Sequence, residues 1–236
     1  MHKSNIGYRA WAVAIYLMTA NLKGVSSMKL HRDLGITQKS VWLMMHKIRE
    51  TFDDEAHELF IGRVEADETY IGGKEKNKHK SKKLNAVRGT VGKTAVIGVK
   101  ERDMNRVSDS PVTSTDPTSI NRYIRNSVKR EATLCTDSAT AYTGVNDRHE
   151  TVNHSVGEFV REQAHKEHSN GIELFWALLK RGYYGTNHRM SEKHLARYVN
   201  EFAGRHNIRS KDAIDQMQWI TQNMDRKQLP YKELVK

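Results

Sequence analysis

The sequence lacks the long apolar runs that membrane proteins carry. No uninterrupted apolar segment reaches the length of about 18 residues that a spanning helix requires. The apolar stretch at residues 11–18 follows Arg9, and no cleavage site comes after it, so it does not read as a signal peptide. We therefore expect a protein with no membrane segment.

Cysteine is almost absent, because Cys135 is the single one. One cysteine excludes an internal disulfide and a zinc ribbon, which needs several thiolate ligands. This usage is typical of a reducing compartment, and we expect the bacterial cytosol, close to the nucleoid. The sequence also contains no P-loop, no nucleophile elbow and no CxxC pair, so the commonest nucleotide-binding and acyl-transfer motifs are excluded.

Positive charge is what the chain has in excess. Its formal net charge is +11 over 236 residues, and a hydrophobic fraction of 37% is sufficient for one core. A balance of this sign suits a polyanion, which is either a nucleic acid or an anionic membrane surface.

Residues 8–22 have the apolar periodicity of a helix, and residues 25–50 then follow a helix-turn-helix plan. A short helix ends at Gly35, Thr37 caps a second helix, and that helix carries Gln38, Lys39 and Ser40 near its start, with Trp42, Lys47 and Arg49 further on. These side-chain types can reach base edges and phosphates. The alternative is a plain helical bundle with a solvated basic face.

The segment 64–73, VEADETYIGG, reads as a strand that carries acids. Alternation places Glu65 and Asp67 on one face and Glu68 on the other. Carboxylates this close repel one another unless a cation neutralises them, so Asp67 is a candidate ligand of a divalent metal. The alternative is a solvated edge strand with protective charges.

A lysine-rich segment follows at residues 74–83 and contains no apolar side chain. It predicts an exposed loop that contacts phosphates beside the acidic strand, and a purely solubilising loop is the alternative. The candidate DNA contacts in it are Lys74, Lys76, Lys78 and Lys80.

The rest of the chain predicts an α/β layout. Strands are expected at 93–102 and 107–113, a helix opens at Pro117, and a short buried strand at 133–136 ends at Asp137. A short helix at 138–145 and a strand near 150–155 follow. A carboxylate just beyond a buried strand is where α/β sheets place functional groups.

A strong amphipathic helix is expected at 168–182, ended by Gly182, with further helices at 191–209 and 212–225. Glu173 and Lys180 share one face of the first helix because they are two turns apart, and Asn170 lies one turn before Glu173. An ordinary surface acid is the alternative reading of Glu173. Together, Asp67, Asp137 and Glu173 offer oxygen ligands for hard cations, Mg²⁺ or Mn²⁺, of which two would serve phosphoryl transfer.

Five segments of the chain, taken in order, carry a resemblance to a known family: VEADETYIGGKEKNKH, GTVGKTAVIGVKER, TDSATAY, NHSVGEFV and HSNGIELFWALLKRGYYGTNHRMSEKHLARYVNEFAGRHNIR. They resemble insertion-sequence transposases of the ISXO-like branch, which is related to Merlin elements and belongs to the DDE superfamily. The resemblance runs from about residue 8 to 217. It implies a ribonuclease-H-like mixed sheet flanked by helices, behind a small all-α helix-turn-helix domain.

The resemblance also implies an activity and a set of site residues. The activity is metal-dependent cleavage of double-stranded DNA at element ends and attack of the 3′-hydroxyl on target DNA, by a homo-oligomer on paired ends. Asp67 and Asp137 map onto the first two catalytic acids, and the interval 173 − 137 = 36 suits Glu173 as the third. Lys180, with Arg181 beside it, matches the basic residue that contacts DNA. The branch often has Asn at the third position, so Asn170 is a rival to Glu173.

Relatives usually carry a zinc ribbon ahead of the helix-turn-helix, and this chain has no cysteines for one. The domain boundaries that we predict are 1–58 for DNA binding, 59–210 for catalysis and 211–236 for a helical tail. Two alternatives remain: a ribonuclease-H-like nuclease that cuts without joining, and an inactive, truncated transposase that only binds DNA.

Overall fold

The computed structural model describes most of the chain, and all structural statements below refer to these residues: 1, 4–53, 58–73, 79–83, 90–137, 142, 144–152, 170–225 and 227–236. The predictions for Lys74, Lys76 and Lys78, and for most of the short helix at 138–145, lie outside them.

Three helices open the chain, α1 (Tyr8–Ala20), α2 (Ser27–Leu34) and α3 (Gln38–Arg49), and a single 3-10 turn, η1 (Glu50–Phe52), follows. Local signals fix the joint between α2 and α3. Gly35 takes the left-handed conformation (φ 66°) that ends α2, and the Thr37 hydroxyl accepts the Ser40 N–H to begin α3. The two predicted helices and the tight turn between them are therefore present.

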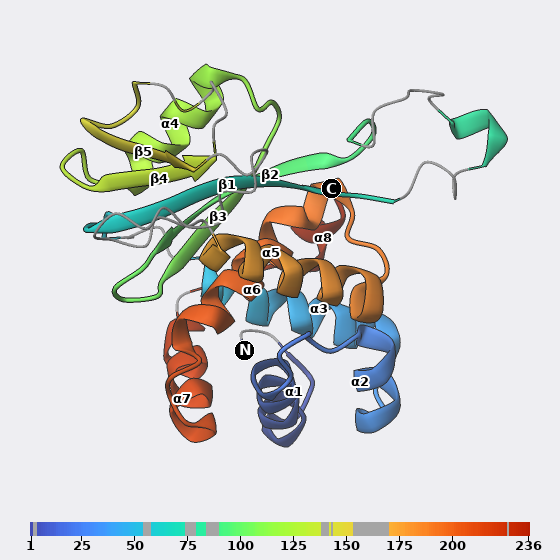
Figure 1. Cartoon of the computed structure of the whole chain (residues 1–236). Helices are drawn as coiled ribbons and strands as arrows, with labels where there is room; N and C mark the ends of the chain where they lie inside the picture. Colours follow the sequence, from blue (N-terminus) through green and yellow to red (C-terminus); the bar gives the residue numbers. More distant parts are fainter. Residues whose placement is uncertain are drawn as a thin grey trace.

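A mixed sheet of five strands is the centre of the molecule (Figure 1). Its order is β3-β2-β1-β4-β5, with β1 antiparallel to β2 and parallel to β4. The strands are β1 (Arg63–Ile71), β2 (Thr94–Glu101), β3 (Val107–Val112), β4 (Thr133–Asp137) and β5 (Arg148–Val152). The predicted ribonuclease-H-like α/β sheet flanked by helices is thus confirmed, and β5 begins two residues earlier than expected.

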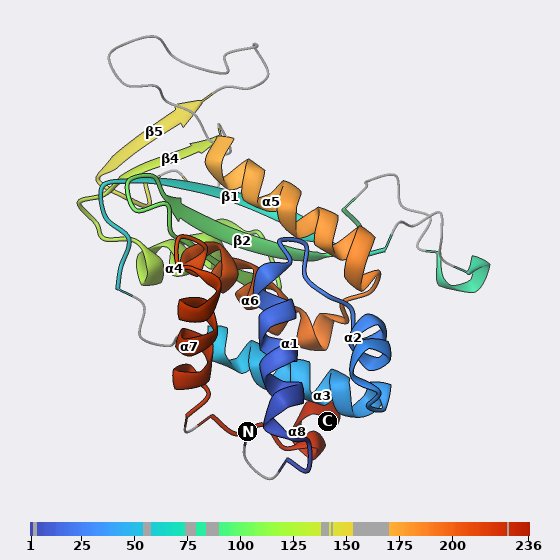
Figure 2. The same ribbon diagram turned by 90° about the horizontal axis from the view of Figure 1, so that it is seen from below.

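Helices cover both faces of this sheet. On one face α4 (Pro117–Ser127) lies against β2, and its Ile120 and Ile124 join Val64 and Ala66 of β1 in one buried cluster. On the other lie α5 (Asn170–Gly182) and α6 (Leu195–Ile208), which follow each other through the π-helical turn η6 (Tyr183–Asn187) and the 3-10 turn η7 (Glu192–His194) (Figure 2). The prediction that Gly182 ends this α-helix is confirmed, although the chain continues directly into the π-helical turn η6; Gly182 also gives room to Phe202 of α6.

The two ends of the chain meet in one core. Helix α7 (Ala213–Asn223) packs beside α1, and its Ile220 joins Trp11 and Ile15 in a buried apolar cluster. The last helix is α8 (Tyr231–Val235), where the Tyr231 ring lies 4.4 Å from the Lys39 ammonium of α3. The C-terminal segment is therefore part of the helical layer built by residues 1–52. Among the helices described, none has the length and apolar character needed to cross a bilayer.

Candidate active site

Asp67 lies in the middle of β1, the central strand of the sheet. Its neighbour in register on β2 is Gly98. Alternation puts Asp67 on the face covered by α5, and on that face a Cβ at Gly98 would approach the Trp176 ring of α5 to 2.6 Å. The absence of a side chain at Gly98 therefore lets α5 lie close to the strand that carries Asp67.

Asp137 ends β4, the strand that runs parallel to β1 on its other side. The register pairs Glu65 with Cys135, and two further residues along each strand lead to Asp67 and Asp137. The two aspartates therefore lie at corresponding positions just beyond the paired part of these adjacent strands.

Glu173 lies in the first turn of α5 and its side chain is exposed. The backbone N–H of Ile172, next to Glu173, donates to Glu65 of β1 at 2.8 Å, so this turn lies against the strand that carries Asp67. Burial raises the pKa of Asp67 to about 7, the hydrogen bond from the Glu68 N–H opposes the rise, and the charges of Glu68, Asp137 and Glu173 add to it. The structure thus brings the three predicted acids into one electrostatic neighbourhood.

Glu68 is a fourth acid there, although its side chain leaves the opposite face of β1. Burial is the main cause that raises its pKa, and the Asp137 charge raises it further. The buried Tyr142 phenol lies beside Glu68, and burial raises the pKa of that phenol too. The sequence did not predict Glu68 as a candidate site residue, because strand alternation places it on the face of β1 opposite Asp67. The effect of the Asp137 charge on Glu68 depends on the position of the end of β4, which alternation does not predict.

The donor chemistry of this neighbourhood fits a hard divalent cation. A cation between carboxylates that raise one another's pKa reduces their mutual repulsion. Carboxylate oxygens are also the ligands that Mg²⁺ and Mn²⁺ prefer. In the described part of the chain, however, no three His, Cys, Asp or Glu side chains already form a metal-holding group.

The rival third ligand and the predicted basic residues lie on the same helix. Asn170 is the first residue of α5, and its side chain is outside the described part of the structure. Lys180 and Arg181 are exposed in the last turn of α5. The helix therefore runs from the acids to a basic end.

The predicted DNA contacts of α3 divide into two groups. Gln38 and Lys39 are exposed at its first turn, Ser40 is half-buried, and the Gln38 amide donates to the Ser27 hydroxyl at 2.9 Å. Arg49, by contrast, is 2% exposed. Its Nε donates to Glu201 of α6 at 2.7 Å, so the prediction that Arg49 reaches DNA is wrong.

Of the four lysines predicted to contact DNA in the segment 74–83, Lys80 is the one that the structure describes. It begins the 3-10 turn η3 (Lys80–Lys82) and is exposed. In both views η3 stands apart from the body of the protein, beyond the ends of β1 and β2 (Figures 1 and 2).

The fold and this arrangement of acids define a ribonuclease-H-like domain with carboxylates on its two central strands and on a covering helix. Residues 60–207 match the family model described as the ISXO2-like transposase domain, so the chain belongs to that family of DDE-superfamily insertion-sequence transposases.

Among solved structures, the chain is similar to one in "CryoEM structure of simian T-cell lymphotropic virus intasome in complex with PP2A regulatory subunit B56 gamma". The identity is 13% and the TM-score 0.35, over 75% of this chain and 63% of that chain. This protein thus spans less than two thirds of the length of that chain. No curated protein matches the sequence.

Proposed function

We propose that this protein is a DNA transposase that cleaves DNA at the ends of an insertion element and joins the ends to target DNA, with Mg²⁺ or Mn²⁺ held by Asp67, Asp137 and Glu173. The observation that carries the proposal is the placement of Asp67 and Asp137 on adjacent parallel strands, next to the helix that carries Glu173. The raised pKa of Asp67, to which the charges of the other two acids contribute, agrees with it. Membership of a transposase family supports the same activity.

The chain's own residues have distinct tasks in this proposal. Asp67 must lose its proton to bind a cation, because only the carboxylate is a good ligand. When bound, a pair of divalent ions lowers the pKa of the attacking water or 3′-hydroxyl and stabilises the leaving oxygen. Lys180 lies two turns from Glu173, roughly 10 Å along the helix axis, and can hold a phosphate of the DNA strand at that distance.

DNA binding outside the acids is assigned to two surfaces. The first is the exposed start of α3, with Gln38, Lys39 and Ser40, within residues 1–58. The second comprises the basic side chains of the lysine-rich segment and of α5: Lys74, Lys76, Lys78, Lys80, Lys180 and Arg181. Residues 59–210 form the catalytic unit, and a homo-oligomer is expected to hold paired ends.

The test is an assay of cleavage and strand transfer on a labelled duplex that carries the element's terminal repeat, with Mn²⁺ or Mg²⁺. The variants Asp67→Asn and Asp137→Asn keep side-chain volume and remove the charge. Glu173→Gln and Asn170→Ala distinguish the two candidates for the third ligand. Glu192→Gln, an exposed helical acid outside the site, is the matched control.

Joined products that disappear with Asp67→Asn and Asp137→Asn, but persist with Glu192→Gln, would support the transposase. Loss with Glu173→Gln alone would assign the third ligand to Glu173, and loss with Asn170→Ala alone would assign it to Asn170. Nicks without joining would identify a nuclease instead. DNA binding without any metal-dependent product would identify an inactive transposase and refute the proposal.

A further inference from the structure

Glu65 is a buried carboxylate on the central strand that the proposed chemistry does not use. It lies two residues before Asp67 on the same face of β1, about 6.6 Å away along the strand. Its side chain is 1% exposed. The Arg102 Nε donates to its Oε1 at 2.8 Å, and the backbone N–H of Ile172 donates to its Oε2 at 2.8 Å.

The Ile172 bond attaches helix α5 to the sheet at the helix start. The first N–H groups of a helix have no partner within the helix, and a carboxylate there also meets the positive end of the helix dipole. Gly171 permits the approach, since a Cβ at that position would come within 2.7 Å of Glu65 Oε2 and 2.7 Å of the Lys100 Nζ. Glu65 is therefore in contact with the turn of α5 that carries Asn170 and Glu173.

We propose that Glu65 is a positioning residue of the metal site. Through its bond to Ile172, Glu65 holds the first turn of α5 in the position relative to β1 that lets Asp67 and the third ligand bind the same ion. This role rests on the proposed function. Metal ligands depend on the groups that orient them, and loss of such a group typically weakens metal binding by about 10–100-fold.

A purely structural role is the competing explanation, and Glu101 provides a matched control for it. Glu101 is also 1% exposed, accepts from an arginine Nε (Arg106) at 2.8 Å, and accepts a backbone N–H (Ile61) at 3.2 Å. Its bonds join β2 to the segment before β1 and touch no part of α5. Glu65 and Glu101 thus have the same exposed fraction and the same kinds of hydrogen-bond donor, but Glu65 binds the start of α5 and Glu101 binds the segment before β1.

The experiment compares Glu65→Gln with Glu101→Gln in the full chain. Glutamine accepts through one oxygen only, so each variant deprives either the arginine or the backbone N–H of its acceptor. The readout is the rise of Tm with Mn²⁺ concentration, which reports metal binding to the folded protein without any DNA. We expect both variants to lower the metal-free Tm, and Glu65→Gln alone to raise the Mn²⁺ concentration at half-effect by about tenfold or more.

A second variant keeps the test decisive if Glu65→Gln does not fold. Gly171→Ala leaves the Glu65 carboxylate intact and pushes it and Lys100 away from the helix start, while alanine favours the helix itself. It is expected to give the same loss of Mn²⁺ response with helical content preserved.

The outcomes separate the two proposals. If the wild-type protein responds to Mn²⁺ and neither Glu65→Gln nor Gly171→Ala changes the midpoint more than Glu101→Gln does, the positioning role is overturned and the metal site stands. If the wild-type protein itself shows no Mn²⁺ response, the metal site of the proposed function fails, and the positioning role fails with it.

Discussion

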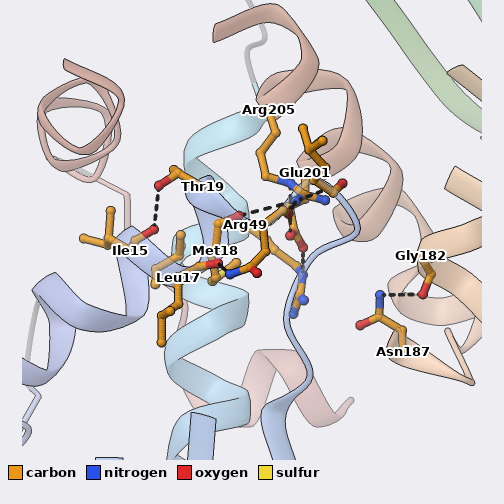
Figure 3. A network of polar contacts seen from close by, with 12 residues as sticks. Ile15, Leu17, Met18, Thr19, Arg49, Gly182, Asn187, Glu201 and Arg205 are labelled. Atoms are coloured by element: carbon orange, nitrogen blue, oxygen red, sulfur yellow. Dashed lines mark hydrogen bonds and ion pairs between the residues drawn. The ribbon is translucent and has the colours of Figure 1, made fainter. Parts of the chain in front are cut away.

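Glu201 of α6 is at the centre of a buried charged cluster that links α6 to the N-terminal helices α1 and α3. Its replacement is the most informative test of how strongly this cluster stabilises the fold. Its carboxylate accepts from Arg49 of α3 at 2.7 Å and lies 3.4 Å from the Arg205 Nε one turn along α6 (Figure 3). Arg205 in turn donates to the carbonyls of Met18 and Leu22 at the end of α1, each at 3.4 Å. One buried acid thus serves two buried guanidinium groups.

The charge balance of this cluster predicts an order of effects. Glu201→Gln would leave Arg49 and Arg205 buried without a counter-charge, which typically costs about 3–5 kcal/mol. Arg49→Met would leave Glu201 paired with Arg205, and methionine retains most of the packing of the arginine stem. Its cost is about 2 kcal/mol, the value of one hydrogen bond between charged groups. Loss of the acid should therefore destabilise more than loss of either base.

Urea unfolding followed by circular dichroism measures these differences as shifts in midpoint at constant slope. Glu50→Gln provides the control: it breaks the half-exposed pair with Arg197 between α6 and the segment after α3, at an expected cost of about 1 kcal/mol or less. A free energy of unfolding for Glu201→Gln that equals or exceeds that of Arg49→Met would refute the charge-balance reasoning.

Three further predictions concern the sheet and the acids. Burial raises the pKa of Asp109 to about 8, so its ionisation opposes folding: the contribution of Asp109 to stability is fully present below its unfolded pKa of about 4 and is lost as the pH rises towards 8, and Asp109→Asn should remove this decrease in thermal unfolding scans. Gly98→Ala forces Trp176 to move and should cost about 1–3 kcal/mol, whereas Gly185→Ala, with open space around it, should cost far less in the same urea titrations. Mn²⁺ must displace a proton from Asp67, whose pKa is raised to about 7, so calorimetry should show affinity falling by up to about tenfold per pH unit below 7; a flat profile from pH 5 to 8 would contradict this.

Local patterns in the sequence were sufficient to predict the strands and the helix that carry the candidate site residues. Strand alternation around Asp67, the position of Asp137 just after a buried strand and the amphipathic pattern around Glu173 each predicted the element observed. They succeeded because a strand or helix that buries one face has its register fixed by its own apolar residues.

The sequence did not predict which residues Arg49 and Glu65 would contact in the folded protein. Arg49 has the position of a DNA-contacting residue in a helix-turn-helix pattern, and only the packing of α6 shows that Glu201 neutralises it in the core. Glu65 looked like one more acid on a charged strand, because its acceptor role depends on Ile172, 107 positions away along the chain. Long-range pairs of this kind leave no periodic signal in a single sequence.

The burial of α3 limits how the helix-turn-helix can meet DNA. Val41, Met44 and Ile48 face the cluster shared with α1 and α7, while Arg49 and His46 face α6 on the other side. A conventional recognition helix lays one whole side in the major groove. Here the exposed residues of α3 are Gln38 and Lys39 in its first turn, so the proposed DNA contact through this helix would be made mainly by its N-terminal end. Because Arg49 of α3 is paired with Glu201 of α6 in the core, a displacement of α3 on binding the proposed DNA would also displace α6.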